Sequence, residues 1–200
     1  MNLSVILGSA SPRRRELLGN LISSFKILPP EIDETPLAHE KPMDYVLRIV
    51  KEKSHAIEDD LTEPSSILLI TADTLVTIDD KILGKPADLD EAVATLTSLQ
   101  GRTHQVMTGL SLLLFDEDGK RSSLIECEIT EVTFKSLSEK EILTYLNNIE
   151  FLDKAGSYAI QSDGKYIVES LEGSLSNVIG LPMGLLYRMI RTLGIEEELL

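Results

Sequence analysis

A small set of charged and polar residues in this sequence stands near predicted strand ends and helix starts, and their types suit phosphate chemistry. Arginine and lysine can bind and neutralise phosphate oxygens, while carboxylates can hold a hard, oxygen-seeking metal ion. Together these residue types favour metal-assisted cleavage of a phosphoanhydride bond. The set comprises Ser9, Arg13, Arg14, Glu34, Lys53, Asp73, Lys85 and Gln161.

The first members of the set lie where a predicted apolar strand (3–7) leads through small residues into a helix. Ser11 is a good N-cap, and Pro12 suits the first helical position. Three arginines, 13–15, then occupy the first turn, where each exposed cation opposes the helix dipole at about 0.3–1 kcal/mol. Free N–H groups, serine hydroxyls and guanidinium groups together favour an anion site. The alternative is a solvated basic turn.

Lys53 lies in the middle of the apolar face of a predicted helix, seven residues after Val46 and four before Ile57. A lysine in such a place either extends its amine to water or reaches into a cleft to meet an anion. Asp73 follows an apolar strand, where a carboxylate is costly to desolvate without a cation or hydrogen-bond partners. Taken alone, Asp73 is also consistent with a turn-forming residue.

The elements that must position these residues predict an α/β fold with a mixed sheet, an N-terminal βα part meeting a hairpin-rich second half. Asp88 and Ser138 are expected helix N-caps, with Glu141 completing a capping box, and Asp79 and Asp80 mark a hairpin turn. Helices are expected at about 12–23, 43–57, 88–100, 138–147 and from Pro182 to about 193, and strands at 25–28, 66–70 continuing to 75–78, 81–86, 104–115, 124–134, 155–161 and 165–169.

Composition narrows the ligand class. The net charge of −14 disfavours non-specific binding to nucleic acid or membrane surfaces, so a nucleic-acid module built on arginines 13–15 conflicts with it. The three histidines lack zinc-site spacing, and no P-loop, dinucleotide or nucleophile-elbow motif occurs. The single cysteine, Cys127, cannot form an internal disulfide, and no signal segment or membrane-length apolar run is found. We therefore expect a cytoplasmic protein that binds a small anion.

The motifs of the chain resemble those of a known family, the Maf proteins. These are nucleoside triphosphate pyrophosphatases of the ITPase-like group and were once described as septum-formation inhibitors. The resemblance spans almost all 200 residues, and the joint order of its motifs is specific although each is short. The motifs are Ser9-Ala10-Ser11-Pro12-Arg13-Arg14, Ile32-Asp33-Glu34, Lys51-Glu52-Lys53, Ala72-Asp73-Thr74, Gly84-Lys85-Pro86, Gly101-Arg102-Thr103-His104, Asp153-Lys154-Ala155-Gly156-Ser157-Tyr158-Ala159-Ile160-Gln161 and Asn177-Val178-Ile179-Gly180-Leu181-Pro182.

The resemblance implies an ITPase-like, Maf/Ham1-type α/β architecture with two lobes, a central mixed, twisted sheet flanked by helices, and a cleft between the lobes. It implies one domain over 1–200 and hydrolysis of a nucleoside triphosphate to the monophosphate and pyrophosphate with Mg²⁺ or Mn²⁺. Asp73 would be the catalytic carboxylate, as general base or metal ligand, and Glu34 would assist at the metal. By the same resemblance, Ser9, Arg13, Arg14, Lys53 and Lys85 would bind the triphosphate, and Arg13, Thr74 and Gln161 would select the base.

Within the family, the segment 153–161 resembles the branch that acts on dTTP and UTP. Modified pyrimidine nucleotides remain open as further substrates, and a homodimer remains open as the oligomeric state. Ala159 and Ser162 stand where glycines are usual, and Leu175 where tyrosine is usual, all expected near the base pocket. The alternative function is a nucleotide-binding regulator of cell division that acts by partner contact with little hydrolysis. The retained Asp73 and Glu34 favour the enzyme, because a binder has no need for two anionic groups beside a triphosphate.

Overall fold

The computed structural model describes residues 3–59, 61, 66–116, 118–161 and 164–199, and a seven-stranded sheet forms its centre. The strands are β1 (Ser4–Gly8), β2 (Lys26–Ile27), β3 (Ile67–Ile78), β4 (Lys81–Leu83), β5 (Thr103–Phe115), β6 (Arg121–Phe134) and β7 (Val168–Glu172). Their order is β2-β1-β3-β5-β6-β7, with β4 paired to β3. β1 runs parallel to β2 and β3, and the other pairs are antiparallel. The sheet is therefore mixed, as predicted.

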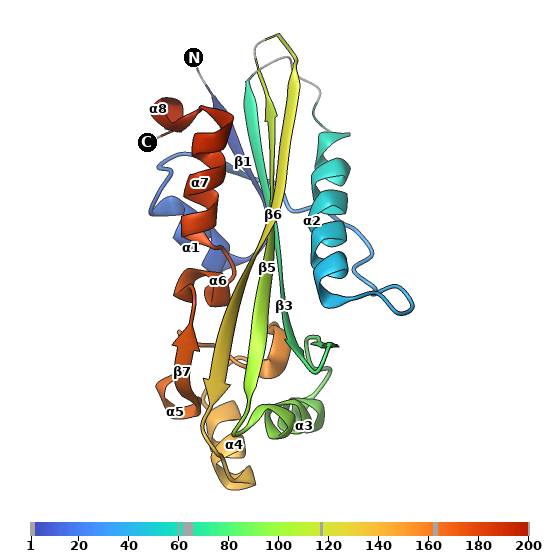
Figure 1. Cartoon of the computed structure of the whole chain (residues 1–200), viewed down its shortest axis with the longest axis vertical. Helices are drawn as coiled ribbons and strands as arrows, with labels where there is room; N and C mark the ends of the chain where they lie inside the picture. The colour runs from blue at the N-terminus through green and yellow to red at the C-terminus, as the bar shows by residue number, and fades with distance from the viewer. Residues whose placement is uncertain (1–2, 60, 62–65, 117, 162–163, 200) are drawn as a thin grey trace.

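Helices cover both faces of this sheet, and the molecule is elongated along its long central strands (Figure 1). The helices are α1 (Pro12–Gly19), α2 (Pro42–Glu58), α3 (Leu89–Leu99), α4 (Glu139–Leu146), α5 (Gly164–Ile167), α6 (Leu175–Ile179), α7 (Met183–Leu193) and α8 (Glu196–Leu199), with a 3-10 turn η1 (Ala155–Ser157). α1 and α7 cover one face, α2 covers the opposite face, and α3 and α4 pack at the far end of the sheet (Figure 1). Among the residues that the structure describes, no helix is long and apolar enough to cross a bilayer.

β3 is the central strand and is buried on both faces. Leu68 and Ile70 pack into the core beneath α1 and α7, while Leu69 packs on the α2 side. Along one edge, β3 pairs with β1 as far as Thr71 opposite Gly8, and its pairing with β4 begins only at Val76 opposite Leu83. Residues 72–75 therefore lack a strand neighbour on that edge within the described part of the sheet. Crevices at such interruptions, beyond the carboxyl end of a parallel strand, are the usual ligand sites of open α/β sheets.

Most of the local predictions from the sequence are confirmed. Ser11, Asp88 and Ser138 cap α1, α3 and α4, and the capping box of Ser138 and Glu141 is complete. The predicted turn at Asp79 and Asp80 has φ values of 50° and 58°, the left-handed backbone of a tight hairpin. The helix expected at 43–57 is α2, and the two long antiparallel strands are β5 and β6. These features depend on signals within one element or between chain neighbours.

Several predicted elements are wrong in extent, among them the strand expected at 124–134, which starts three residues earlier at Arg121. The first helix ends at Gly19 rather than 23, where a glycine and an asparagine, both poor helix formers, follow each other. The strand at 25–28 shortens to 26–27, and the one at 81–86 to 81–83. The strand at 165–169 starts instead as the helical turn α5 and becomes β7 only from Val168.

The strand predicted at 155–161 does not exist in the structure, and two short helices were missed. Gly156 and Ser157 have φ values of 70° and 62°, which no strand accommodates. A Cβ atom on Gly156 would lie 2.8 Å from Val76, so the backbone turns there against the sheet. The alternation of apolar and polar residues in this segment gives no sign of the close contact between Gly156 and the distant Val76. The helices α6 and α8 were not predicted because each spans about one turn.

His104 lies in the core at the far end of the sheet and gives a pH prediction. It is 2% exposed, stacks edge-on against Phe134 and Tyr158, and burial lowers its pKa to about 4. In the unfolded chain His104 binds a proton near pH 6.5, whereas in the folded protein it binds one only near pH 4. Stability is therefore expected to fall by up to about 3 kcal/mol as the pH drops through this window.

The measurement is the urea midpoint of unfolding between pH 7 and pH 4, compared with a His104→Gln variant. Glutamine does not titrate, so the variant should show a flatter dependence from pH 6.5 to 4.5. The hydrogen bond from Arg48 lowers the pKa of Glu40 from 4.5 to about 2. Protonation of Glu40 therefore reduces stability only below about pH 4.5, outside that range. Equal slopes for the two proteins above pH 4.5 would contradict the prediction.

Candidate functional site

A cleft of about 740 Å³ opens at the interrupted edge of β3. Its walls include the end of β1, the start of α1, the Glu34 loop, α2, β4 and the segment after η1. The sequence placed the predicted site residues on separate elements, and the structure brings them all to this one cleft. They are Ser9, Arg13, Arg14, Glu34, Lys53, Asp73, Thr74, Lys85 and Gln161.

The ammonium group of Lys53 lies between two carboxylates in this cleft. Its Nζ atom is 2.7 Å from Oδ1 of Asp73 and 2.7 Å from Oε1 of Glu34. Lys53 is 7% exposed and Asp73 8%, whereas the Glu34 side chain is 45% exposed. Lys53 therefore reaches into the cleft rather than into bulk water. Asp73 is no turn-former, because it pairs within β3 opposite Gly109.

The pKa of Glu34 reports the same cluster. Partial burial acts to raise it, but the hydrogen bond and charge of Lys53, helped by Lys85 and Arg14, outweigh burial and hold the pKa below its usual value. Glu34 is therefore ionised at neutral pH. The cluster then holds two carboxylates and one ammonium, with further cations nearby.

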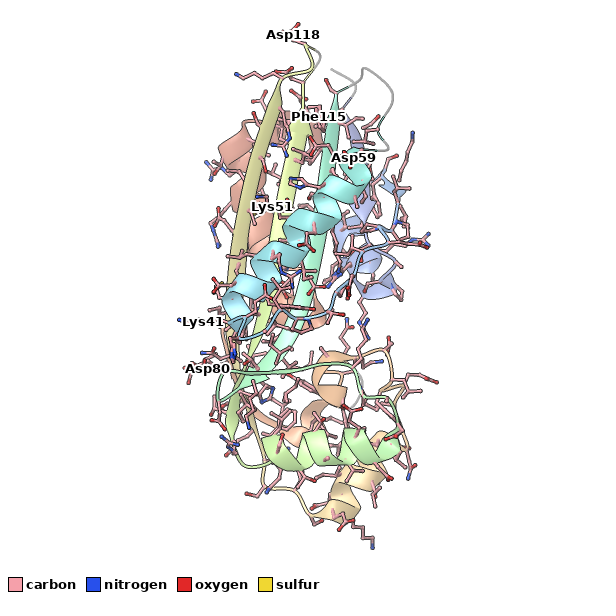
Figure 2. All side chains as sticks on the ribbon, turned by 90° about the vertical axis from the view of Figure 1, so that its right-hand side faces the viewer. Lys41, Lys51, Asp59, Asp80, Phe115 and Asp118 are labelled. Carbon is pink, nitrogen blue, oxygen red and sulfur yellow. The ribbon has the colours of Figure 1, made fainter. Side chains whose placement is uncertain are left out.

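The packing of α2 explains why Lys53 points inward. Figure 2 shows α2 lying across the sheet, with Lys51 on the side away from it. The next residue is anchored by buried hydroxyls, since Ser54 Oγ lies 2.9 Å from both Thr71 Oγ1 and Ser111 Oγ. The helix also sits close to the sheet at Gly109, where a Cβ atom would be 2.9 Å from the Val46 carbonyl oxygen. This close seating brings the Lys53 stem over β3.

Arg14 contributes a guanidinium group that donates hydrogen bonds to three neutral oxygens. Its Nε donates to the Gly180 carbonyl at 2.8 Å, Nη1 to Ser9 Oγ at 3.2 Å and Nη2 to Thr74 Oγ1 at 3.1 Å. Burial lowers its pKa, and the charges of Asp73 and Glu34 offset part of that shift. No carboxylate lies within salt-bridge distance of Arg14 among the described residues. An anion entering the cleft would meet an oriented and unneutralised positive charge.

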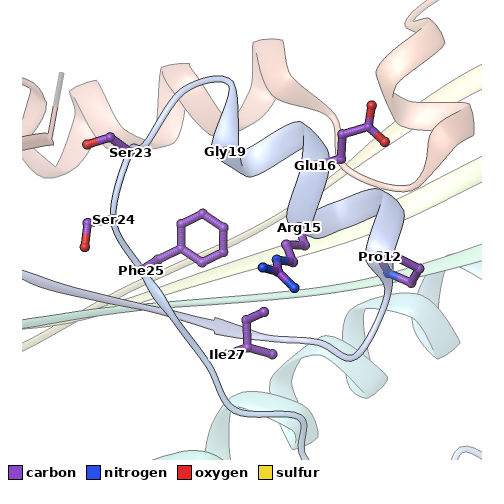
Figure 3. A pocket seen from close by; sticks show the side chains of 8 residues that line it. All are labelled: Pro12, Arg15, Glu16, Gly19, Ser23, Ser24, Phe25 and Ile27. Carbon is purple, nitrogen blue, oxygen red and sulfur yellow. The ribbon is translucent and has the colours of Figure 1, made fainter.

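The neighbouring arginines differ in their surroundings. Arg13 makes a 3.4 Å ion pair with Asp153, which precedes η1, and so joins two walls of the cleft. Arg15 instead lines a second, shallower cavity of about 590 Å³ with Phe25 and Ile27, on the outer side of α1 (Figure 3). Of the three arginines in the first turn, only the first two line the main cleft.

The residues that hold the Glu34 loop were not among those predicted from the sequence. Tyr45 donates its hydroxyl to the Glu34 carbonyl at 2.9 Å, and burial raises the Tyr45 pKa to about 12. Arg48 binds Glu40 through two hydrogen bonds of 2.6 and 2.7 Å. One signal was available for Tyr45, which lies eight residues before Lys53 on the same helical face. The Arg48 contact joins a helix to a loop, and no local pattern reveals it.

Gln161 lies in a turn at the cleft, four residues after Ser157. Ala159, one of the departures from the family pattern, also lines the cleft. Leu175, expected near the base pocket, starts α6, is 53% exposed and is not among the described lining residues. Ser162 lies outside the described part of the chain.

The donor set of the cleft suits a metal ion only in combination with another ligand. Among the described residues no group of three or more His, Cys, Asp or Glu side chains is arranged to hold a metal. Asp73 and Glu34 nevertheless converge on one point, occupied by the Lys53 ammonium. Mg²⁺ is commonly bound through one or two carboxylates together with substrate phosphates and water. The pair fits that mode of binding.

Comparison with known proteins shows the family to which this chain belongs. Residues 4–193 match the family model described as "Maf-like protein". A "dTTP/UTP pyrophosphatase" of Myxococcus xanthus is 44% identical over 191 residues, covering 96% of this chain and 93% of the relative. Another of that name, from Clostridioides difficile, is 43% identical over 189 residues, covering 94% of each. The Staphylococcus aureus Ham1 structure covers 94% of this chain and 98% of its own, with 11% identity and a TM-score of 0.45. Because the family model matches residues 4–193 and the two pyrophosphatase relatives are more than 40% identical over nearly the whole chain, the chain belongs to the Maf family.

Proposed function

We propose that this protein is a nucleoside triphosphate pyrophosphatase that hydrolyses dTTP and UTP to the monophosphate and pyrophosphate. The observation that carries the proposal is the pairing of opposite charges in one cleft, with the Asp73 carboxylate held 2.7 Å from Lys53 near an unneutralised Arg14. Relatives named dTTP/UTP pyrophosphatases support the substrate class. The cleft draws on residues from Gly8 to Gly180, so we further propose that the chain acts as one domain. We also propose that it acts on a small-molecule substrate in the cytoplasm, in keeping with its net charge of −14 and its single cysteine.

In this proposal the triphosphate is bound by four cationic side chains and one hydroxyl, those of Arg13, Arg14, Lys53, Lys85 and Ser9. Their charges neutralise the phosphate oxygens and orient the α-phosphorus towards Asp73. Asp73 takes a proton from the attacking water or serves as a metal ligand, with Lys53 fixing its carboxylate through Oδ1. The new bond joins the water oxygen to the α-phosphorus, the bond from that phosphorus to the bridging oxygen breaks, and pyrophosphate leaves.

Asp73 and Glu34 would hold the Mg²⁺ or Mn²⁺ ion together with the phosphates. Such an ion, when bound, polarises the phosphoryl group and neutralises developing charge. The Glu34 loop, fixed to α2 through Tyr45 and Arg48, keeps the Glu34 carboxylate opposite Asp73 before substrate arrives.

The reaction type is tested by its first products. Incubation of dTTP with the protein and Mg²⁺ should give dTMP and pyrophosphate in equal amounts by ion chromatography, and EDTA should abolish the reaction. A nucleoside diphosphate with orthophosphate as first products would refute the proposed bond cleavage. Tight nucleotide binding with negligible turnover would instead support the alternative function, a nucleotide-binding regulator of cell division that acts by partner contact.

Base selection gives a second prediction, on Gln161. Its side chain offers one acceptor and two donors, enough to read the O4 and N3–H edge that thymine and uracil share. Cytosine reverses both groups, so CTP should be the poorer pyrimidine substrate. Since unpaired polar groups cost about 1–3 kcal/mol each, Gln161→Ala should narrow the dTTP-to-CTP ratio of kcat/KM about tenfold.

The matched control is Gln105→Ala, because Gln105 lies on β5 and is not among the described residues of the cleft. The measurement is kcat/KM for dTTP, UTP, CTP and GTP with both variants. An unchanged dTTP-to-CTP ratio in Gln161→Ala would mean that another residue reads the base.

A further inference from the structure

The segment that leads to Gln161 is held by two tyrosine hydroxyls, those of Tyr145 and of the cleft-lining Tyr158, whose hydrogen-bond partners are Ala159 and His104. The Tyr145 hydroxyl donates to the Ala159 carbonyl and accepts from the Ala159 amide, both at 3.1 Å. The Tyr158 hydroxyl shares a 2.9 Å hydrogen bond with Nε2 of His104. Both tyrosines are less than 10% exposed. Two consecutive residues, 158 and 159, are thereby fixed just before Ile160 and Gln161.

These contacts tie the segment to two different elements of the core. Tyr145 belongs to α4, and His104 to β5. His104 is enclosed edge-on by Phe134 and Tyr158, whose ring centroids lie 4.8 and 5.4 Å away. Neither Tyr145 nor His104 is among the cleft-lining residues that the structure describes. Their contacts therefore shape the cleft wall from behind.

The backbone here depends on such support. Residues 156 and 157 both have left-handed φ angles, and Ser157 is not a glycine. A non-glycine residue in this region is strained and persists only where its surroundings fix it. The segment also contributes no strand to the sheet, so no ladder of hydrogen bonds holds it. The side-chain hydrogen bonds from Tyr145 and His104 substitute for that ladder.

We propose that the hydroxyl groups of Tyr145 and Tyr158 are positioning groups for base selection, because they fix the segment that presents Gln161 to the nucleobase. This inference rests on the proposed function, in which Gln161 reads the pyrimidine edge. Bidentate reading needs the amide within a few tenths of an ångström of its place, whereas phosphate binding by long cationic side chains tolerates more movement. Loosening the segment should therefore affect the choice of base more than binding of phosphate.

The test uses Tyr145→Phe and Tyr158→Phe, which keep the aromatic ring and remove only the hydroxyl. Each should lower the dTTP-to-CTP ratio of kcat/KM by about three- to tenfold and leave the affinity for inorganic tripolyphosphate within twofold of wild type. Tyr187→Phe is the matched control, because it removes a surface hydroxyl bound to Glu196 at the other end of the molecule. The control should leave both quantities unchanged.

A double variant separates positioning from a general structural effect. In a Gln161→Ala background, Tyr145→Phe should change the dTTP-to-CTP ratio no further, since its effect passes through Gln161. A merely structural role would lower activity on every nucleotide alike, in both backgrounds. Unchanged ratios in both folded Tyr→Phe variants, beside a changed ratio in Gln161→Ala, would overturn this inference alone. A wild-type protein without preference for dTTP or UTP would overturn the proposed function itself, and the inference with it.

Discussion

An Asp73→Asn variant is expected to keep its fold and to lose at least about a hundredfold in kcat on dTTP. A positioned general base contributes about 10²–10⁴-fold, and asparagine keeps the shape of aspartate without its charge or basicity. The fold should survive because Lys53 keeps a second carboxylate partner, Glu34, at 2.7 Å. The measurement is the steady-state rate with saturating dTTP and Mg²⁺, together with the melting temperature.

Asp80→Asn is the matched control for this substitution. Asp80 is exposed in the turn between β3 and β4, with a φ of 58° that asparagine tolerates well. It should retain full activity. Near-normal turnover in a folded Asp73→Asn protein would limit the role of Asp73 to anchoring the Lys53 ammonium.

Segments with a strong local signal could be predicted from the sequence. The apolar face of α2 repeats over four turns, and its expected range of 43–57 differs from the observed one by a single residue at each end. The capping box of Ser138 and Glu141 depends on residues three apart. β5 and β6 follow each other along the chain and pair as a hairpin. In each case neighbours in sequence are also neighbours in space.

Predictions failed where a distant residue determines the backbone. The segment 155–161 has the composition of a strand, but it packs so closely against β3 that a Cβ atom on Gly156 would lie 2.8 Å from Val76, and residues 156 and 157 take left-handed φ angles. The site shows the same division. Lys53 and Asp73 could be singled out because each is out of place in its own element. The residues that hold Glu34, namely Tyr45, Arg48 and Glu40, are ordinary in their own segments, and only tertiary structure joins them.

Replacing Lys53 by methionine is expected to cost both stability and triphosphate affinity. Methionine is a good helix former of similar length, so α2 itself should remain intact. The cost arises at Asp73, which is 8% exposed and would lose the ammonium 2.7 Å away. Removing one partner of a buried ion pair costs about 3–5 kcal/mol, and we expect the lower end because the cleft is open to water. In a chain of 200 residues this corresponds to a fall in Tm of about 6–12 °C.

Two further variants show whether the loss comes from the unpaired carboxylate. The double variant Lys53→Met/Asp73→Asn removes the buried unpaired charge of Asp73, and the Glu34 carboxylate that also loses Lys53 is 45% exposed to water. Most of the lost Tm should therefore return, while tripolyphosphate affinity, measured by calorimetry, stays low. Lys51→Met removes an exposed lysine from the opposite side of the same helix (Figure 2) and should change stability by less than about 0.5 kcal/mol. A Lys53→Met protein that melts no lower than wild type and binds tripolyphosphate equally well would mean that the ammonium neither compensates Asp73 nor meets the phosphates.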